Sequence, residues 1–160
     1  MGKIIIGYPG IGKSTLAGIK NGYIDLESSM FSCDDTKVDH WAQIYVNVAV
    51  DLCLQGYTVF VSSHALVINE LKKRKKSFEV IVVCPSIKLE KDWIKKLESR
   101  YFVSKNNNEP STYKNYRAWN RSAGHYKEDI DSLMNCGFNC IVINDMTYDL
   151  TSLLSTKVME

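Results

Sequence analysis

Short apolar runs alternate along the chain with stretches in which apolar residues recur every three or four positions. The apolar runs are rich in β-branched residues and predict strands at 4–6, 23–26, 58–61, 80–83 and 140–143. The helical spacing between them predicts helices at about 39–55, 65–75 and 93–100. Because short apolar strands separated by helices are typical of a parallel sheet covered on both faces, the sequence predicts an α/β fold.

The pattern contains no internal repeat and no linker, so we expect a single domain over residues 1–160. With 45% hydrophobic residues, the chain can bury a substantial core. No apolar stretch reaches the length of a transmembrane helix, and the first predicted strand stands where a signal peptide would be. We therefore expect no membrane partner.

Charge and cysteine content narrow the range of partners and compartments. The net charge of +2 at pH 7 is nearly balanced, so composition alone does not indicate binding to nucleic acid or to a membrane surface. The five cysteines are odd in number and have no CxxC spacing. Reduced, mostly structural thiols are therefore expected, which favours a cytoplasmic location and disfavours a zinc site.

One long segment, residues 104–122, departs from the alternation of strands and helices. It is rich in Asn, Ser, Tyr, Lys and Arg and has little apolar periodicity at its start. A polar segment of this length inside a compact domain is usually functional or disordered. In an enzyme that transfers a phosphoryl group, the functional interpretation is a mobile lid, here at about 101–124, that closes over the nucleotide and excludes water.

The strongest chemical signal lies directly after the first predicted strand. Residues 7–14 read Gly-Tyr-Pro-Gly-Ile-Gly-Lys-Ser and match the phosphate-binding pattern G-x-x-x-x-G-K-[ST]. Its glycines let backbone N–H groups turn toward a phosphate chain, Lys13 can reach the β- and γ-phosphates, and the Ser14 hydroxyl can ligate Mg²⁺. A chance match is disfavoured because the match is complete and a helix start follows it. The residues expected to bind nucleotide are Tyr8, Pro9, Gly10, Ile11, Gly12, Lys13, Ser14 and Thr15.

With this motif and this order of elements, the chain resembles the P-loop small-molecule kinases, which include nucleoside and nucleotide kinases, shikimate and gluconate kinases and relatives of polynucleotide kinase. The resemblance covers most of the chain in element order and is specific at the phosphate loop. It implies a three-layer α/β/α P-loop NTPase fold with a five-stranded parallel sheet in the order 2-3-1-4-5. It also implies ATP, with GTP as an alternative donor, and Mg²⁺. A small chain with a compact lid is also similar to kinases encoded by phages or prophages.

Asp25 and Glu27, at the end of the second predicted strand, resemble the D-x-D of shikimate kinase-like enzymes. The resemblance implies that Asp25 supports Mg²⁺ or acts as the base, and that Glu27 holds or deprotonates the acceptor hydroxyl. Alternation along a strand puts both carboxylates on one side. At the carboxyl end of a parallel strand they would face the crevice where ligands bind. The alternative is a pair of solvated loop acids.

The third predicted strand ends in Ser62, Ser63 and His64, where many P-loop proteins carry the Walker B aspartate. Either Asp25 takes over that role, as in the shikimate kinase-like branch, or the site is degenerate. Ser62 is expected to bind the acceptor or a metal-bound water, and His64 to contact the substrate. The alternative for His64 is a helix-start residue without a chemical role.

Three arginines around the polar segment are candidates for binding phosphate: Arg100, Arg117 and Arg121. Arg117 and Arg121 lie four residues apart and would share a helix face. Arginine can neutralise the charge of a transferring phosphoryl group and bind it through two hydrogen bonds, so we expect at least one of the three to contact phosphate. The alternative is that they are solvated.

Other aromatic and basic residues leave a role in nucleic-acid binding open. Tyr113, Tyr116 and Trp119 could stack on a base or anchor the lid to the core. The basic run at 72–76 could contact nucleic acid or form a solvated face at a helix end.

The sequence thus predicts an ATP-dependent phosphotransferase that moves the γ-phosphoryl group to a nucleoside monophosphate or a nucleoside-like small acceptor. One alternative is a kinase that acts on nucleic-acid ends or bases. The other, motivated by the absent Walker B aspartate, is a nucleotide-binding switch or slow NTPase.

Overall fold

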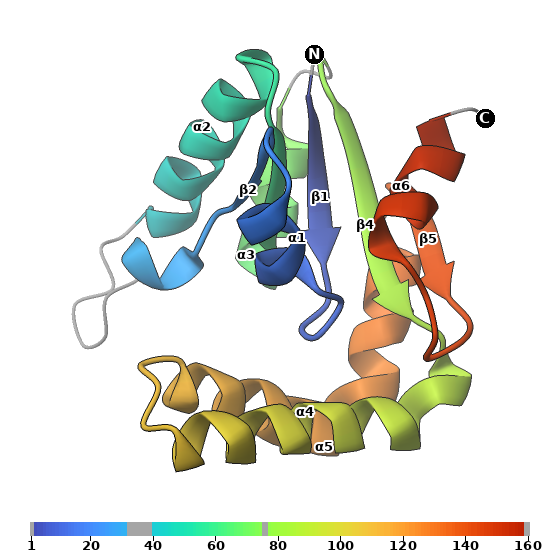
Figure 1. Ribbon diagram of the computed structural model, residues 1–160. Coiled ribbons are helices and arrows are strands. Elements are labelled where there is room, and N and C mark those ends of the chain that lie inside the picture. The colour runs from blue at the N-terminus through green and yellow to red at the C-terminus, as the bar shows by residue number, and fades with distance from the viewer. Residues whose placement is uncertain (1, 32–39, 75–76, 159–160) are drawn as a thin grey trace.

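A computed structural model of the chain describes residues 2–31, 40–74 and 77–158 (Figure 1). Five strands form one all-parallel sheet in the order β2-β3-β1-β4-β5. Their bounds are β1 Lys3–Gly7, β2 Tyr23–Asp25, β3 Thr58–Ser62, β4 Glu79–Pro85 and β5 Asn139–Ile143. The predicted α/β class, the five parallel strands and the strand order are confirmed.

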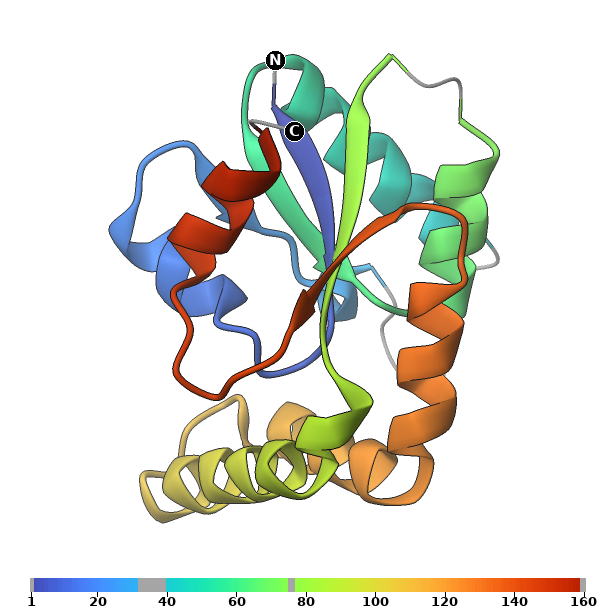
Figure 2. The same ribbon diagram turned by 90° about the vertical axis from the view of Figure 1, so that its right-hand side faces the viewer.

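Helices cover both faces of the sheet. Their bounds are α1 Lys13–Ile19, α2 Trp41–Leu54, α3 Ala65–Lys72, α4 Glu90–Asn106, α5 Thr112–Met134 and α6 Leu150–Val158, with short 3-10 helices η1 Ser28–Met30 and η2 Ile87–Leu89. Figure 2 shows α6 on one face of the sheet, and α3 with the second half of α5 on the other. No helix among the described residues is both long and apolar enough to cross a membrane.

The three central strands carry the core. Ile4, Ile5 and Ile6 of β1 are fully buried between the equally apolar β3 and β4. Each such side chain contributes about 1.5–3 kcal/mol when it leaves water. In this register Gly7 pairs with Ser62 of β3 and Val83 of β4. The carboxyl ends of the central strands therefore lie side by side, and the segments that follow them share one edge of the sheet.

The polar segment 104–122, expected to be a mobile lid and given no secondary structure of its own from the sequence, is mostly helical. It comprises the end of α4, a short connection and the first half of α5, and these two helices pack against each other as a hairpin. Figure 1 shows this α4–α5 hairpin lying across the carboxyl ends of the strands. Three buried positions of the hairpin are polar: Ser104, Asn115 and Ser122. Apolar periodicity is weak for that reason. Movement of the hairpin as a lid stays a prediction.

Helix α5 is bent at His125, whose φ of −138° and ψ of 20° are not helical. Beyond this kink the helix packs on β4 and buries Tyr126, Ile130 and Leu133. The kink therefore separates the half of α5 that belongs to the hairpin from the half that covers the sheet.

Candidate functional site

The loop between β1 and α1, residues 7–14, has a conformation that requires glycine. Gly10 and Gly12 have φ angles of 92° and 104°, in the left-handed region. A Cβ atom on Gly7 would lie 2.7 Å from Cδ1 of Ile11 and 2.8 Å from Cδ of Lys13. The loop therefore folds back on itself tightly and brings Lys13 to the end of β1.

Side chains from distant elements hold the backbone carbonyls of this loop. The indole N–H of Trp93 on α4 donates to the carbonyl of Pro9 at 2.9 Å. The hydroxyl of Tyr148, between β5 and α6, donates to the carbonyl of Ile11 at 2.8 Å. The N–H groups of residues 10–12 donate to no group in the described part of the chain. The loop thus presents donors that an anion can accept from.

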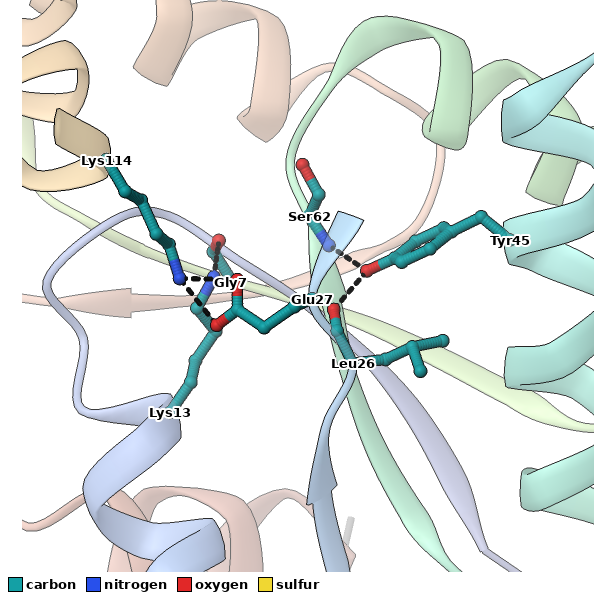
Figure 3. A network of polar contacts seen from close by, with 7 residues as sticks. All are labelled: Gly7, Lys13, Leu26, Glu27, Tyr45, Ser62 and Lys114. Atoms are coloured by element: carbon teal, nitrogen blue, oxygen red, sulfur yellow. Dashed lines mark hydrogen bonds and ion pairs between the residues drawn. The ribbon is translucent and has the colours of Figure 1, made fainter. Parts of the chain in front are cut away.

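Lys13, Asp25 and Glu27 lie together at this edge of the sheet. The ammonium of Lys13 donates to the carbonyl of Gly7 at 3.3 Å (Figure 3). Burial lowers the pKa of Lys13, whereas the negative charges of Asp25 and Glu27 raise it. Burial raises the pKa of Asp25, which the charge of Lys13 lowers and that of Glu27 raises further. The loop lysine and the two carboxylates are therefore close enough to shift one another's pKa.

The hairpin adds two cations to this cluster, Arg100 from α4 and Lys114 from α5. Lys114 donates from Nζ to both carboxylate oxygens of Glu27, at 2.5 and 2.6 Å (Figure 3). Burial lowers the pKa of Arg100, and the charge of Glu27 raises it. The Nε of Arg100 is buried and has no hydrogen-bond partner among the described residues. A buried donor without a partner is costly, and a phosphate oxygen would satisfy it.

Lys114 was not among the residues singled out from the sequence. It precedes Arg117 by three residues and Arg121 by seven, so the helical spacing that groups the arginines includes it. Its partner Glu27 is 87 positions away, and no sequence pattern joins the two.

The two other candidate arginines have different surroundings. Arg121 donates from Nε and Nη2 to the carboxylate of Asp129 at 2.8 and 2.7 Å. Arg117 is exposed, and its guanidinium lies 5.9 Å from the ring centre of Tyr113. Of the three, the structure brings Arg100 into the cluster around Lys13. A phosphate contact by Arg117 or Arg121 stays a prediction.

Ser62 and His64 lie at the expected edge of the sheet, and both have local hydrogen bonds. The Ser62 hydroxyl accepts from the backbone N–H of His64 at 3.1 Å. Nδ1 of His64 accepts from the N–H of Leu66 at 3.1 Å, so His64 caps α3. The predicted contacts of Ser62 and His64 with an acceptor or substrate stay predictions.

A buried tyrosine positions the carboxylate-bearing segment, and the sequence did not indicate it. The hydroxyl of Tyr45 donates to the carbonyl of Leu26 at 2.7 Å and accepts from the N–H of Ser62 at 2.9 Å (Figure 3). Burial raises the pKa of Tyr45. Its position on the apolar face of α2 looks like an ordinary core position, so nothing in the sequence distinguishes it.

Ser14 and Asp25 are the residues that could support Mg²⁺. Ser14 is exposed at the start of α1, and Asp25 is half-buried at the end of β2. Among the described residues, no group of three or more His, Cys, Asp or Glu side chains could hold a metal ion. Mg²⁺ bound here would take most of its ligands from phosphate oxygens and water, as it commonly does.

The hairpin aromatics mainly hold its two helices together. Trp119 of α5 stacks on Tyr101 of α4, with ring centres 5.6 Å apart, and also lies 5.8 Å from Phe102. Tyr113 and Tyr116 line an open groove of about 540 Å³ at the tip of the hairpin. Trp119 thus anchors α5 to α4, and stacking of Tyr113, Tyr116 or Trp119 on a base stays a prediction.

The basic run at 72–76 is described only as far as Arg74. Lys73 and Arg74 both pair with Glu70, at 3.2 and 3.7 Å. Residues 75 and 76 lie outside the described residues. This part of the run is therefore partly neutralised by its own helix.

Comparisons with known proteins assign this chain to no family. The chain matches no protein-family model, and no curated protein matches it significantly.

Proposed function

We propose that this protein is a P-loop phosphotransferase that moves the γ-phosphoryl group of ATP to a nucleoside monophosphate or a nucleoside-like acceptor, with Mg²⁺ as cofactor and GTP as an alternative donor. The observation that carries the proposal is the buried Nε of Arg100, which has no hydrogen-bond partner among the described residues and belongs to the same cluster as Lys13 and Asp25. These groups lie beside a glycine-dependent loop whose N–H groups at 10–12 donate to no group in the part of the chain that the structure describes. Such a combination suits a polyphosphate.

Each residue then has a role that its surroundings support. The loop N–H groups and Lys13 hold the phosphates, and the Ser14 hydroxyl holds the metal ion. Asp25 supports that ion or accepts the proton of the acceptor, and its raised pKa makes its carboxylate a stronger base than an exposed one. Arg100 neutralises charge that develops on the transferring group.

The position of the α4–α5 hairpin also supports a phosphotransferase. It spans the carboxyl ends of the strands (Figure 1) and contributes Arg100 and Lys114 to the cluster. A cover in this position would exclude water from the reaction and so favour transfer over hydrolysis.

A second function, a nucleotide-binding switch or slow NTPase, is favoured by one observation. β3 ends in Ser62, next to Gly7, and therefore offers no carboxylate where many such proteins hold the metal ion. A switch would hydrolyse or retain nucleotide without passing a phosphoryl group to a small acceptor.

The test is a transfer assay with ATP and GTP as donors and a panel of nucleosides, nucleoside monophosphates and small hydroxyl compounds, read by mass. We expect transfer by the native protein and a loss of at least about 100-fold in Lys13→Ala, because the lysine stabilises charge in the transition state. Lys95→Ala, an exposed lysine of α4, is the matched control and should keep full activity. Nucleotide binding without any transfer would support the switch instead, and full activity in Lys13→Ala would refute the phosphate assignment.

A further inference from the structure

We infer that Lys114 binds an anionic group of the phosphoryl acceptor, so that the protein selects phosphomonoester or carboxylate acceptors over uncharged nucleosides and sugars. The inference rests on the proposed function and specifies its acceptor class. Without an acceptor, the Lys114 ammonium donates hydrogen bonds to the Glu27 carboxylate. The anionic group of the acceptor displaces this carboxylate when it binds.

The geometry brings Lys114 to the acceptor side of the site. Lys114 is the third residue of α5, and its ammonium reaches from the hairpin to the segment that follows β2. In Figure 3 the Lys114 ammonium, from α5, reaches Glu27, whereas the Lys13 ammonium, from α1, donates to the Gly7 carbonyl. A group bound at Lys114 therefore lies beside Asp25 and Glu27, the residues expected to orient the acceptor.

The cluster holds a third cation, Lys114, besides the two that the proposed function assigns to the donor phosphates. Lys13 and Arg100 are the cations suited to the transferring phosphoryl group, and Asp25 faces Lys13. Lys114 remains as a further cation at the same edge of the sheet. A neutral acceptor gives this side chain no partner beyond Glu27, whereas an anionic acceptor does.

The pair with Glu27 is weak enough to be exchanged. The side chains of Lys114 and Glu27 are 54% and 33% exposed. Ion pairs between partly exposed side chains contribute little net free energy, because solvent screens them and both side chains lose conformational freedom. A phosphate offers more oxygens and more charge than one carboxylate, and charge-assisted hydrogen bonds to it are stronger. Displacement of Glu27 by such a group also frees the Glu27 carboxylate to accept from the acceptor hydroxyl.

A purely structural role for Lys114, in which its ion pair with Glu27 only holds the hairpin against the segment after β2, predicts different kinetics. Loss of this ion pair would then weaken donor and acceptor binding together, or would change only the thermal stability. Loss of an acceptor contact raises the KM of the acceptor and leaves the KM of ATP unchanged.

The experiment compares the native protein with Lys114→Met and Lys114→Arg in steady-state transfer assays. The acceptors are nucleosides, their 5′-monophosphates and small hydroxy carboxylates. A comparison of the last two classes shows whether Lys114 binds a phosphate or a carboxylate group. We expect transfer to one of the anionic classes and a KM for that acceptor raised about 10- to 100-fold in Lys114→Met. The KM of ATP should change less than about twofold. Lys114→Arg should restore most of the acceptor affinity, since it keeps the charge.

Lys105→Met is the matched control, because Lys105 is an exposed hairpin lysine without an ion pair among the described residues. It should leave both KM values unchanged. Transfer to uncharged nucleosides as efficient as transfer to the anionic acceptors, or a rise in the KM of ATP in Lys114→Met, would overturn the inference and leave the proposed function standing. Absence of transfer to every acceptor by the native protein would overturn both.

Discussion

The loop at 7–14 and the α4–α5 hairpin are built in opposite ways. The loop is specified locally, by glycines at positions where φ is positive or where a Cβ atom would clash. The hairpin is specified by distant contacts, and its packed faces include the polar residues Ser104, Asn115 and Ser122. One can be identified by a short motif, whereas the other has no motif at all.

The two regions nevertheless depend on each other. Trp93 of the hairpin holds the carbonyl of Pro9, and the hydroxyl groups of Tyr8 and Ser122 lie 2.6 Å apart in a buried hydrogen bond. Burial raises the pKa of Tyr8 to about 12, so it remains a neutral hydrogen-bonding group at physiological pH. A motif that is local in sequence is therefore held by hydrogen bonds from residues 84 and 114 positions away.

The largest change in stability is expected at Gly10, where the backbone of the loop packs against α4. In Gly10→Ala the new Cβ would lie 3.0 Å from Cδ2 of Leu97 and 3.2 Å from Nε1 of Trp93, at a φ of 92°. We expect the free energy of unfolding, measured by urea denaturation, to fall by about 2–3 kcal/mol, and ATP binding to be lost. Gly22→Ala is the control, because its φ is 89° and its Cβ would meet nothing within 4 Å. Equal losses in the two variants would mean that the hairpin contributes nothing to the constraint at Gly10.

An intermediate effect is expected when the hairpin loses its hydrogen bond to the loop. Trp93→Phe removes the donor to the Pro9 carbonyl and part of a fully buried side chain. The free energy of unfolding should fall by about 1–2 kcal/mol. The Kd for ATP should also rise, as calorimetry would detect. Trp119→Phe, which keeps the stacking within the hairpin, should leave the ATP affinity unchanged; if it weakens ATP binding as much as Trp93→Phe does, the bond to Pro9 is not the cause.

The smallest change in stability is expected from the titration of Asp25, a residue whose replacement should affect catalysis far more than folding. Its folded-state pKa is raised, chiefly by burial. The folded protein therefore holds this proton more tightly than the unfolded chain, and stability falls as the pH rises from the ordinary carboxyl pKa through the raised one. Asp25→Asn should remove this fall and slightly raise the urea midpoint at neutral pH, while greatly lowering kcat. Asp51→Asn, on the exposed side of α2, is the control. A urea midpoint that drops in Asp25→Asn would show that attraction to Lys13 outweighs burial.

Much of the fold was predictable because it rests on local patterns. The apolar runs at β1, β3 and β4 have no polar interruption, and the helical spacing of α2 is regular, so their types and positions followed directly. The strand order came from the resemblance to P-loop kinases and agrees with the structure. The first half of α5 was missed as a helix because its packing faces are partly polar.

The sequence by itself determined the loop at 7–14, the strands and helices on either side of it and the two carboxylates at the end of β2, because each depends on residues close together in the chain. Only the tertiary structure decided which hairpin cations face that loop. Helical spacing groups Lys114, Arg117 and Arg121, but it cannot show that Lys114 meets Glu27 while Arg121 meets Asp129. The partners are set by how the α4–α5 hairpin crosses the ends of the strands, and that crossing depends on buried contacts such as the one between Trp93 and Pro9.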